Sequence, residues 1–468
     1  MLRLRPIHER DTLWDVLLPA GVTLLPPDLA AIDELLAEPA LLAPFRALWQ
    51  RQDAATGRCA EHHGRPTLPM ASYVRLMLVK VRTGWGYETL VREVSDSLHL
   101  RRFCLIALSE PVPDESTVRK LTRRLGPDLV AELIRGLIEM AARERRFRPA
   151  AMRTDSTVVE ADIRYPTDAG LAATGVRLLA RAARRLRAVS EGLTPAVRDR
   201  SRSVGRRLRA MTRTLRRRTG EAREVVLRLT DEAGELLGRS VTEARRALAL
   251  ARSGALEQGA RVRRAVERLE TVLAHATRVV EQIGKRVRGE HISDRLVSFC
   301  DPDARPVRKG RIATPTQSGY VTQLAELTSS TRRGARGLIL PPVTRAGSVP
   351  EDHLLVETLA ELRGRGLRPA EAVFDAGFTV RATRAALAGL GTEASIVGSA
   401  TNAGSRRTRR RLARYRVGCE GRIAHLKREY GARRSRLRGL DGARIWEGWA
   451  VLAYDIDTAA ALPPRRRR

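Results

Sequence analysis

The spacing of apolar residues between positions 171 and 290 constrains the fold more than any other feature of this chain. Apolar residues recur there at alternating steps of four and three: Val262, Val266, Leu269, Leu273, Ala276, Val280, Ile283 and Val287. The same kind of spacing relates Val204, Leu208, Met211 and Leu215. It is typical of a coiled-coil seam and predicts long antiparallel helices in an inserted hairpin, with arginine outside. These helices could contact DNA or dimerise, but a solvated charged face is the simpler role for each arginine.

The segments on both sides have the pattern of an α/β domain that the helical insertion interrupts. Residues 152–159 form a β-branched run that predicts a strand, with Asp155, Thr157 and Val159 on one face. Further strands are expected at 295–300, 318–327, 337–344, 370–378 and 393–400, with a basic turn at 301–311. Helices are expected at 352–364, 411–430 and 443–462, followed by a disordered, phosphate-seeking basic tail. Trp446 and Trp449 are expected to anchor the last helix in the core.

Residues 1–150 are expected to form a helical domain. One helix places Lys80 at helical spacing with apolar neighbours. A later helix has Asp114 as its N-cap and Gly126 as its C-terminal stop. Its predicted outer face carries Arg119, Lys120, Arg123 and Arg124. A capped basic helix after a turn fits a helix-turn-helix DNA reader, and it equally fits an ordinary solvated helix.

Charge narrows the class of partner. Lysine and arginine number 86 against 53 acidic residues, a net charge of +33. This excess predicts binding to a polyanion, most simply nucleic acid, through phosphate contacts. A GC-rich genome would explain abundant arginine, but it would not explain why acids fail to balance it. Scattered cysteines, no long apolar run and no secretory signal predict a cytoplasmic protein without a membrane partner.

Three acids stand where a core role does not explain them. Asp155 lies in the first expected strand, Asp375 follows a strand before Ala-Gly-Phe, and Glu420 lies on a later helix. On neighbouring strands and a nearby helix, they can converge at one edge of a sheet. Carboxylates are the preferred ligands of Mg²⁺. Two such ions about 3.5–4 Å apart can drive an in-line phosphoryl transfer.

Arg416, Glu420 and Lys427 follow the pattern R-x3-E-x6-K, whose steps return to one helix face. Glu420 could bind metal while Arg416 and Lys427 hold DNA phosphates. From spacing alone, a surface ion pair between Arg416 and Glu420 is the simpler interpretation. Lysine is rare in this chain, however, with five residues in total, so its use at position 427 is notable.

The chain resembles DDE transposases of bacterial insertion sequences in the broad IS4/IS5-like group, nearest to the ISNCY and IS1182 types. The segment "RPTLPMASYVRLMLVKVRTGWGYETLVREVSDSLHLRRFC" is similar to their N-terminal helical domain. "TDSTVVEADIRYPTD" resembles their first-aspartate segment, and "DPDARPVRKGR" with "GYVTQLAE" resembles their middle strands. "VFDAGF" resembles the second-aspartate segment, and "RVGCEGRIAHLK" resembles the glutamate segment of the Y-x2-R-x3-E-x6-K signature.

The resemblance implies an RNase H-like catalytic fold in which Asp155, Asp375 and Glu420 bind two Mg²⁺ or Mn²⁺ ions. It implies DNA cleavage by water at element ends, in the terminal inverted repeats, and attack of a free 3′-hydroxyl on target DNA. Arg416 and Lys427 would contact DNA near the ions. One departure is that Ala413 occupies the signature tyrosine position, two residues before Tyr415.

The expected organisation has three parts. Residues 1–150 form the DNA-binding domain, residues 151–170 and 291–468 form the catalytic domain, and residues 171–290 form the insertion. Because two element ends must be paired, a homodimer on DNA is expected, in a bacterial cytoplasm at the nucleoid. The alternatives are a catalytically inactive, domesticated DNA-binding protein and a basic coiled-coil scaffold. The three acids argue against the first, and the α/β half is unexplained by the second.

Overall fold

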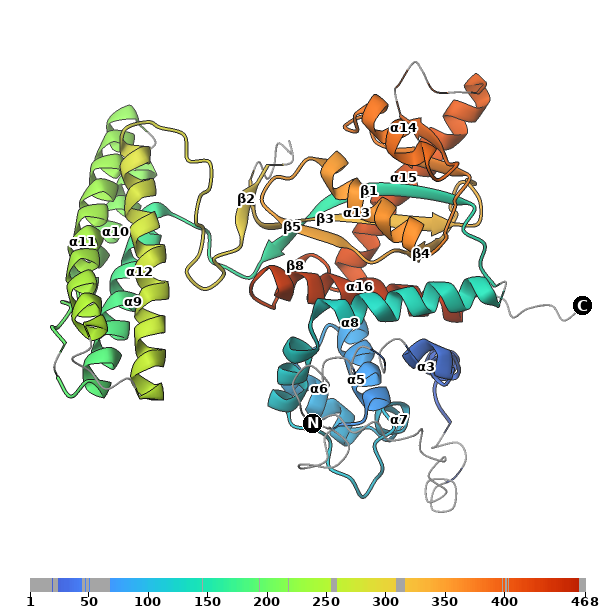
Figure 1. The fold of residues 1–468 in the computed structure, drawn as a ribbon, viewed down its shortest axis with the longest axis horizontal. Helices are drawn as coiled ribbons and strands as arrows, with labels where there is room; N and C mark the ends of the chain where they lie inside the picture. The colour runs from blue at the N-terminus through green and yellow to red at the C-terminus, as the bar shows by residue number, and fades with distance from the viewer. Residues whose placement is uncertain are drawn as a thin grey trace, which may run out of the picture. The chain divides into compact units, whose positions relative to one another are not determined.

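The computed structural model describes residues 19, 24–43, 47, 50, 68–144, 146–192, 194–217, 219–253, 259–308, 316–397, 399, 402 and 404–462. The chain divides into two compact units, drawn in Figure 1. Unit 1 comprises residues 1–160, 320–345 and 349–468, and unit 2 comprises residues 161–319 and 346–348. The expected basic tail, residues 463–468, lies outside the described residues. None of the described helices has the length and apolar character needed to cross a lipid bilayer.

A mixed sheet positions the elements of unit 1. Its strands are β1 (Ala151–Ala161), β3 (Gln317–Thr328), β4 (Gly337–Ile339), β5 (Val343–Ala346), β6 (Glu371–Phe374), β7 (Glu393–Ile396) and β8 (Arg434–Ser435). The strand order is β2-β3-β1-β6-β7, where β2 (Arg305–Val307) pairs with the first residues of β3 inside unit 2. Strands β1, β6 and β7 run parallel, and β4 is antiparallel to β3. The central strand β1 is buried along almost its whole length.

Helices cover this sheet and share its apolar core. They are α3 (Pro27–Leu36), α5 (Met70–Thr83), α6 (Tyr87–Asp96), α7 (Leu98–Phe103), α8 (Glu115–Arg143), α13 (Glu351–Gly364), α14 (Val380–Ala388), α15 (Arg406–Glu429) and α16 (Leu440–Ala460). Figure 1 shows α16 running beside α8, and α16 also packs on α5 and β4. One core joins Leu76 of α5, Met152 of β1 and Trp449 of α16. The N-terminal helices and the sheet are therefore one compact unit, and the three-domain division stays a prediction.

Helix α8 has the expected cap and the expected break. The Asp114 carboxylate accepts a hydrogen bond from the Ser116 backbone N–H, which satisfies one of the free donors at the helix start. At Gly126 the backbone leaves the helical region, with φ 73° and ψ −177°. A second helical segment begins at Pro127, where the missing N–H costs nothing. Gly126 thus ends the basic segment but not the whole element.

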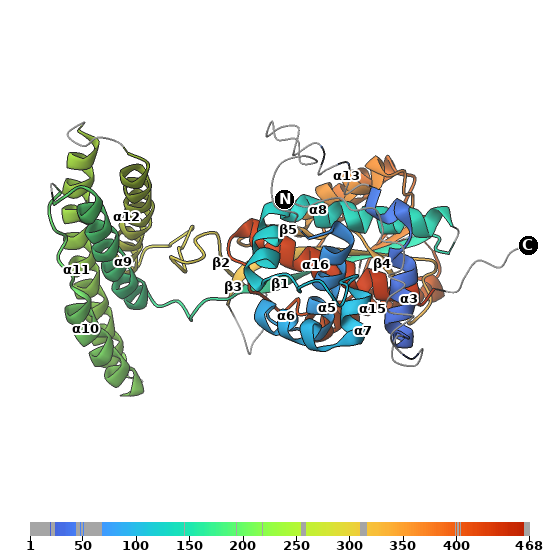
Figure 2. The same cartoon turned by 90° about the horizontal axis from the view of Figure 1, so that it is seen from below.

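Unit 2 consists mainly of four helices that lie side by side (Figures 1 and 2), where a hairpin of long antiparallel helices was expected. They are α9 (Asp168–Val189), α10 (Ser201–Thr214), α11 (Gly220–Arg252) and α12 (Ala260–Val287). The seam of α12 faces their common core, with Leu269, Ala276 and Ile283 fully buried. In the apolar series that runs from Val204 to Leu215, the last residue does not join this core. Leu215 is 59% exposed, because α10 ends at Thr214. Each helix contributes one apolar face, and four such faces bury one another.

Two further expectations about the strands were wrong. Residues 295–300 contain no strand, since Leu296 and Val297 are buried as irregular backbone. The expected turn at 301–311 contains β2, while residues 309–311 lie outside the described part. The remaining expected strands and helices are present, with boundaries shifted by a few residues. Trp449 is a core anchor as expected, whereas Trp446 is only partly buried.

Candidate active site

Parallel pairing of β1 with β6 brings two of the predicted acids together. The register aligns Ala151 with Glu371 and Arg153 with Val373, an offset of 220 residues. Asp155 and Asp375 are separated by the same interval, so continuing the register places Asp375 next to Asp155. Each uses its Oδ1 to accept a hydrogen bond from the next backbone N–H, at 2.8 and 2.6 Å respectively. Their Oδ2 atoms remain for other partners.

Arg416 on α15 joins all three predicted acids. Its Nη2 donates to Oδ2 of Asp155 at 3.2 Å and to Oδ2 of Asp375 at 2.9 Å. Its Nη1 donates to Oε1 of Glu420 at 2.7 Å. The Arg416 side chain is only 12% exposed, while those of Asp375 and Glu420 are 41% and 57% exposed. The expected ion pair with Glu420 is present, but it is one of three.

The electrostatics of Arg416 follow from this arrangement. Burial lowers the pKa of its guanidinium, but the carboxylates of Asp155, Asp375 and Glu420 outweigh burial and raise that pKa above its usual value. Its Nε is buried and has no hydrogen-bond partner among the described residues. The site therefore has three carboxylates around one fixed positive charge.

The donor set fits hard divalent cations, which prefer carboxylate oxygens. As placed, however, each of the three acids contacts Arg416. Within the described part of the chain, no group of three or more His, Cys, Asp or Glu side chains is arranged to hold an ion together. A metal ion held by these acids would compete with the Arg416 guanidinium for Oδ2 of Asp155, Oδ2 of Asp375 and Oε1 of Glu420.

A buried network anchors α15 against the sheet beside this site. Arg153 of β1 donates from Nη2 to Glu326 of β3 at 2.7 Å and from Nη1 to the Tyr415 carbonyl at 2.7 Å. The Arg153 and Glu326 side chains are each 1% exposed, and Arg422 of α15 also donates to Glu326, at 3.1 Å. Because Tyr415 precedes Arg416, Arg153 sets the position from which Arg416 reaches the acids.

Sequence reasoning did not find this network. Arg153 and Glu326 are charged residues inside expected strands, and that was the available signal, since charged residues are rarely buried unless paired. Gly418 completes the network: a Cβ there would lie 2.0 Å from Nη1 of Arg153. Only glycine at position 418 therefore leaves room for the Arg153 side chain to cross α15.

Tyr415, two residues after the signature position, faces the buried network. It is fully buried, and its hydroxyl is 2.6 Å from Oγ1 of Thr328. Its ring lies 4.7 Å from the Arg153 guanidinium carbon. Tyr415 therefore supports the buried network, whereas Ala413 occupies the signature position.

A fourth acid, which the sequence did not single out, lies near the three. Glu351, the first residue of α13, accepts a short hydrogen bond from the hydroxyl of Ser156, next to Asp155. Its other oxygen would be 3.8 Å from a Cβ at Gly377, in the loop after Asp375. Glu351 thus connects the surroundings of the two aspartates.

The other predicted contact residues lie outside this cluster. Lys427 is partly buried, and its ammonium donates to the carbonyl of Val158 on β1 at 2.9 Å. The four basic residues predicted on the outer face of α8 are exposed: Arg119, Lys120, Arg123 and Arg124. These α8 residues therefore lie on the surface of unit 1, where Arg119 pairs with Glu115 at 3.5 Å, and Lys427 contacts β1 near its end.

Two family models match parts of the chain. Residues 29–124 match the family described as Transposase domain (DUF772). Residues 334–456 match the family described as Transposase DDE domain. Neither a curated protein nor a solved structure matches the chain. The two matches, in this order, are typical of IS4/IS5-like transposases, and a DDE domain implies phosphoryl transfer on DNA with divalent metal ions.

The matched segments divide the candidate site. Asp375, Arg416, Glu420 and Lys427 lie within the DDE match, and the basic residues of α8 lie within the N-terminal match. Asp155 lies in neither. Its link to the site is the ion pair with Arg416.

Proposed function

We propose that this protein is a DNA transposase whose RNase H-like domain cleaves DNA at the ends of a transposable element and joins them to target DNA. Asp155, Asp375 and Glu420 are the catalytic carboxylates. One observation carries the proposal: three acids from two strands and a helix, far apart in sequence, contact a single guanidinium. Asp375 and Glu420 also lie within the DDE match, and their side chains are 41% and 57% exposed, so their carboxylates are accessible to a ligand.

The same three residues would hold two Mg²⁺ or Mn²⁺ ions. When bound, such ions activate the attacking oxygen and stabilise the leaving oxygen of an in-line displacement at phosphorus. Arg416 neutralises the carboxylates until then. Once it leaves them, its planar guanidinium can form two hydrogen bonds to a DNA phosphate.

In this proposal, positively charged side chains hold the DNA. Arg416 and Lys427 contact the strand near the ions, and Arg119, Lys120, Arg123 and Arg124 of α8 contact the duplex further away. The net charge of +33 supplies the sequence-independent part of the affinity. Pairing of two element ends would be done by a homodimer on DNA.

Cleavage of a duplex that carries the element's terminal inverted repeat, with Mg²⁺ or Mn²⁺, tests the proposal. We expect Asp375→Asn to abolish cleavage and to leave DNA binding within a fewfold of the original protein. Asp441→Asn is the matched control, because the Asp441 side chain is 74% exposed and pairs with Arg444 and not with Arg416. Equal loss of cleavage in both variants, or cleavage that survives in Asp375→Asn, would contradict the assignment.

The inactive, domesticated DNA-binding protein is the other outcome of the same assay. Wild-type protein that binds the duplex but never nicks it, with either metal, would support that alternative.

A further inference from the structure

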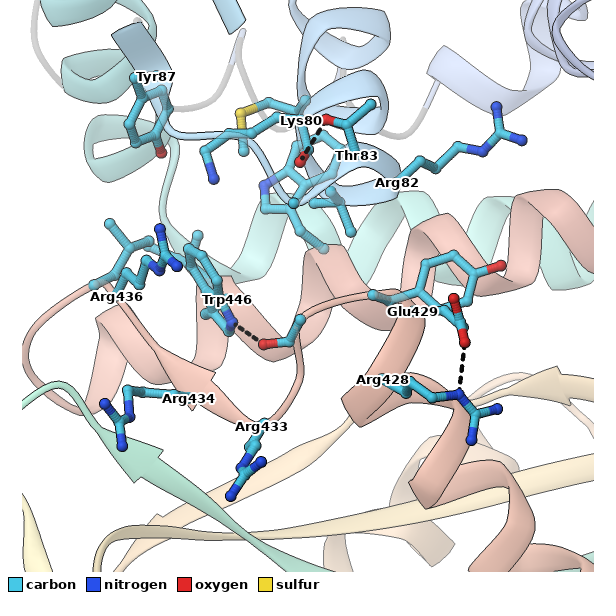
Figure 3. A pocket seen from close by; sticks show the side chains of 18 residues that line it. Lys80, Arg82, Thr83, Tyr87, Arg428, Glu429, Arg433, Arg434, Arg436 and Trp446 are labelled. Atoms are coloured by element: carbon cyan, nitrogen blue, oxygen red, sulfur yellow. Dashed lines mark hydrogen bonds and ion pairs between the residues drawn. The ribbon is translucent and has the colours of Figure 1, made fainter. Parts of the chain in front are cut away.

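A cavity of about 440 Å³ lies in unit 1 (Figure 3), and none of the three acids lines it. It is bounded by the end of α5, the start of α6, the turn after α15 and the middle of α16. Its volume is comparable to that of a small-ligand site. The residues that face one another across it in Figure 3 include Lys80, Tyr87, Arg436 and Trp446.

Lys80 is the unusual group in this cavity. It is only 4% exposed, and its Nζ lies 4.7 Å from the ring centroids of both Tyr87 and Trp446. No hydrogen bond or ion pair joins its ammonium to any of the described residues. Burial, helped by the charge of Arg436, lowers the pKa of Lys80 to about 8. A buried charge without an ionic or hydrogen-bond partner is costly, and such groups cluster at functional sites.

The charge around the cavity is strongly positive. Its arginines are Arg82, Arg428, Arg433, Arg434 and Arg436, against one carboxylate, Glu429, which is bonded to Arg428 at 2.6 Å. Arg82 and Arg434 have acidic partners outside the cavity, Asp457 and Glu160. Within the described part of the chain, Arg433 and Arg436 have none. The cavity therefore has uncompensated positive charge.

We propose that this cavity binds a phosphodiester group of the DNA strand that the three acids would cleave, between the ammonium of Lys80 and the guanidinium of Arg436. The inference rests on the proposed function. An anion at this position removes the repulsion between the two cations and supplies the hydrogen-bond acceptor that Lys80 lacks. The rings of Tyr87 and Trp446 hold the lysine from both sides, so the site is formed before the strand arrives.

Helix α15 connects the two places. Arg428, at the cavity, follows Glu420 by eight residues, which is about 12 Å along a helix. Duplex DNA rises roughly 3.4 Å per base pair, so this distance corresponds to three or four base pairs. Arg434 continues the same path, because it pairs with Glu160 near the end of β1, the strand that carries Asp155. One DNA strand can therefore reach both sites.

The test measures binding of a fluorescent DNA duplex as a function of salt, without divalent metal. We expect Lys80→Met and Arg436→Gln each to weaken binding about fivefold at 0.15 M salt, the effect of losing one released counterion. Each should also lower the slope of log affinity against log salt by about 0.9. Arg345→Gln is the matched control, since it removes one arginine of unit 1 that pairs with Glu357 outside both sites.

Folding is checked separately by circular dichroism, and Arg436→Gln guards against a folding defect because Arg436 is exposed. The inference is overturned if both variants bind DNA with the affinity and salt slope of Arg345→Gln. It is also overturned if pyrophosphate raises the Tm of wild-type protein but not of Lys80→Met while DNA binding is unchanged, because the ligand is then a free anion. Failure of cleavage, with these binding changes intact, would instead contradict the proposed function.

Discussion

At the scale of single residues, Arg416 acts as the counter-ion of the site. Three carboxylates that would otherwise repel one another are held by one guanidinium, which is only slightly exposed. A pattern of R-x3-E on a helix is compatible with an ordinary surface pair. Only the positions of β1 and β6 show that the same arginine reaches two more acids.

We expect Arg416→Gln to lower the free energy of unfolding by roughly 1–2 kcal/mol, since it leaves partly buried acids uncompensated while solvent screens Asp375 and Glu420. Mn²⁺ should raise the Tm of this variant more than that of wild-type protein, because the ion no longer competes with the guanidinium. Thermal unfolding with and without Mn²⁺ measures both effects. The control is Arg411→Gln on the same helix, whose exposed pair with Glu371 is worth less than about 1 kcal/mol. If Mn²⁺ raises the Tm of wild-type protein, Arg416→Gln and Arg411→Gln equally, Arg416 is not the counter-ion of the site.

Lys80 predicts an unusual pH dependence. Its pKa is about 8 in the folded protein against 10.5 for an ordinary lysine, so the unfolded state binds more protons between these values and stability rises with pH. Below pH 8 the penalty is complete, and it amounts to about 3 kcal/mol. Arginine side chains do not titrate in this pH range, and burial raises the pKa of Tyr87, so these neighbours do not reverse the trend.

Lys80→Met should therefore be more stable than wild-type protein at pH 7, and its advantage should shrink as the pH approaches 10.5. Denaturant unfolding at pH 7 and near pH 10 measures the difference. A variant that is less stable at pH 7 would show that Lys80 has a stabilising partner.

At the scale of elements, the contact between α15 and β1 decides whether the site forms. Arg153 crosses α15 at Gly418 and binds the carbonyl of Tyr415. Sequence reasoning placed α13, α15, α16 and most strands, because their apolar periodicity is local. It did not place Arg153 or Glu326, because their pairing joins residues 173 positions apart and leaves no periodic signal.

Gly418→Ala should lower the free energy of unfolding by about 2–3 kcal/mol and impair cleavage, since the new Cβ displaces Arg153 and with it the turn that carries Arg416. Gly421→Ala is the control on the same helix. Nothing lies within 4 Å of a Cβ there, so it should raise stability by about 0.5–1 kcal/mol. Chemical denaturation of both variants, with DNA cleavage as the second readout, tests this. Similar stability changes in the two variants would contradict the conclusion that Arg153 crosses α15 at Gly418.

At the scale of the whole molecule, unit 2 has a core of its own and about half of the excess charge. Residues 171–290 contain 29 basic and 13 acidic residues. The start of α9 meets the end of α12, where Asp168 pairs with Arg286 and accepts from Gln282 at 3.3 Å. Entry and exit of the helical insertion are therefore close together, and a short linker can join them.

Replacing residues 168–290 with a short glycine-serine linker should leave unit 1 folded, with little change in the Tm of its transition. DNA affinity should fall, and its salt slope should fall by several times the change expected for Lys80→Met, if the basic helices contact DNA. Calorimetry and salt-dependent binding measure the two effects. If the salt slope does not change, the arginines of the insertion form a solvated face and do not contact DNA.

The sequence by itself determined the class of partner, the helical insertion and the identity of the candidate acids, because charge, heptad spacing and strand patterns are local properties. The tertiary structure decided that Arg416 joins the three acids, that Arg153 holds α15 in place, and that Lys80 lies in a cationic cavity. These depend on residues brought together from distant segments, and the energies that select such contacts depend on burial, which a linear sequence does not specify.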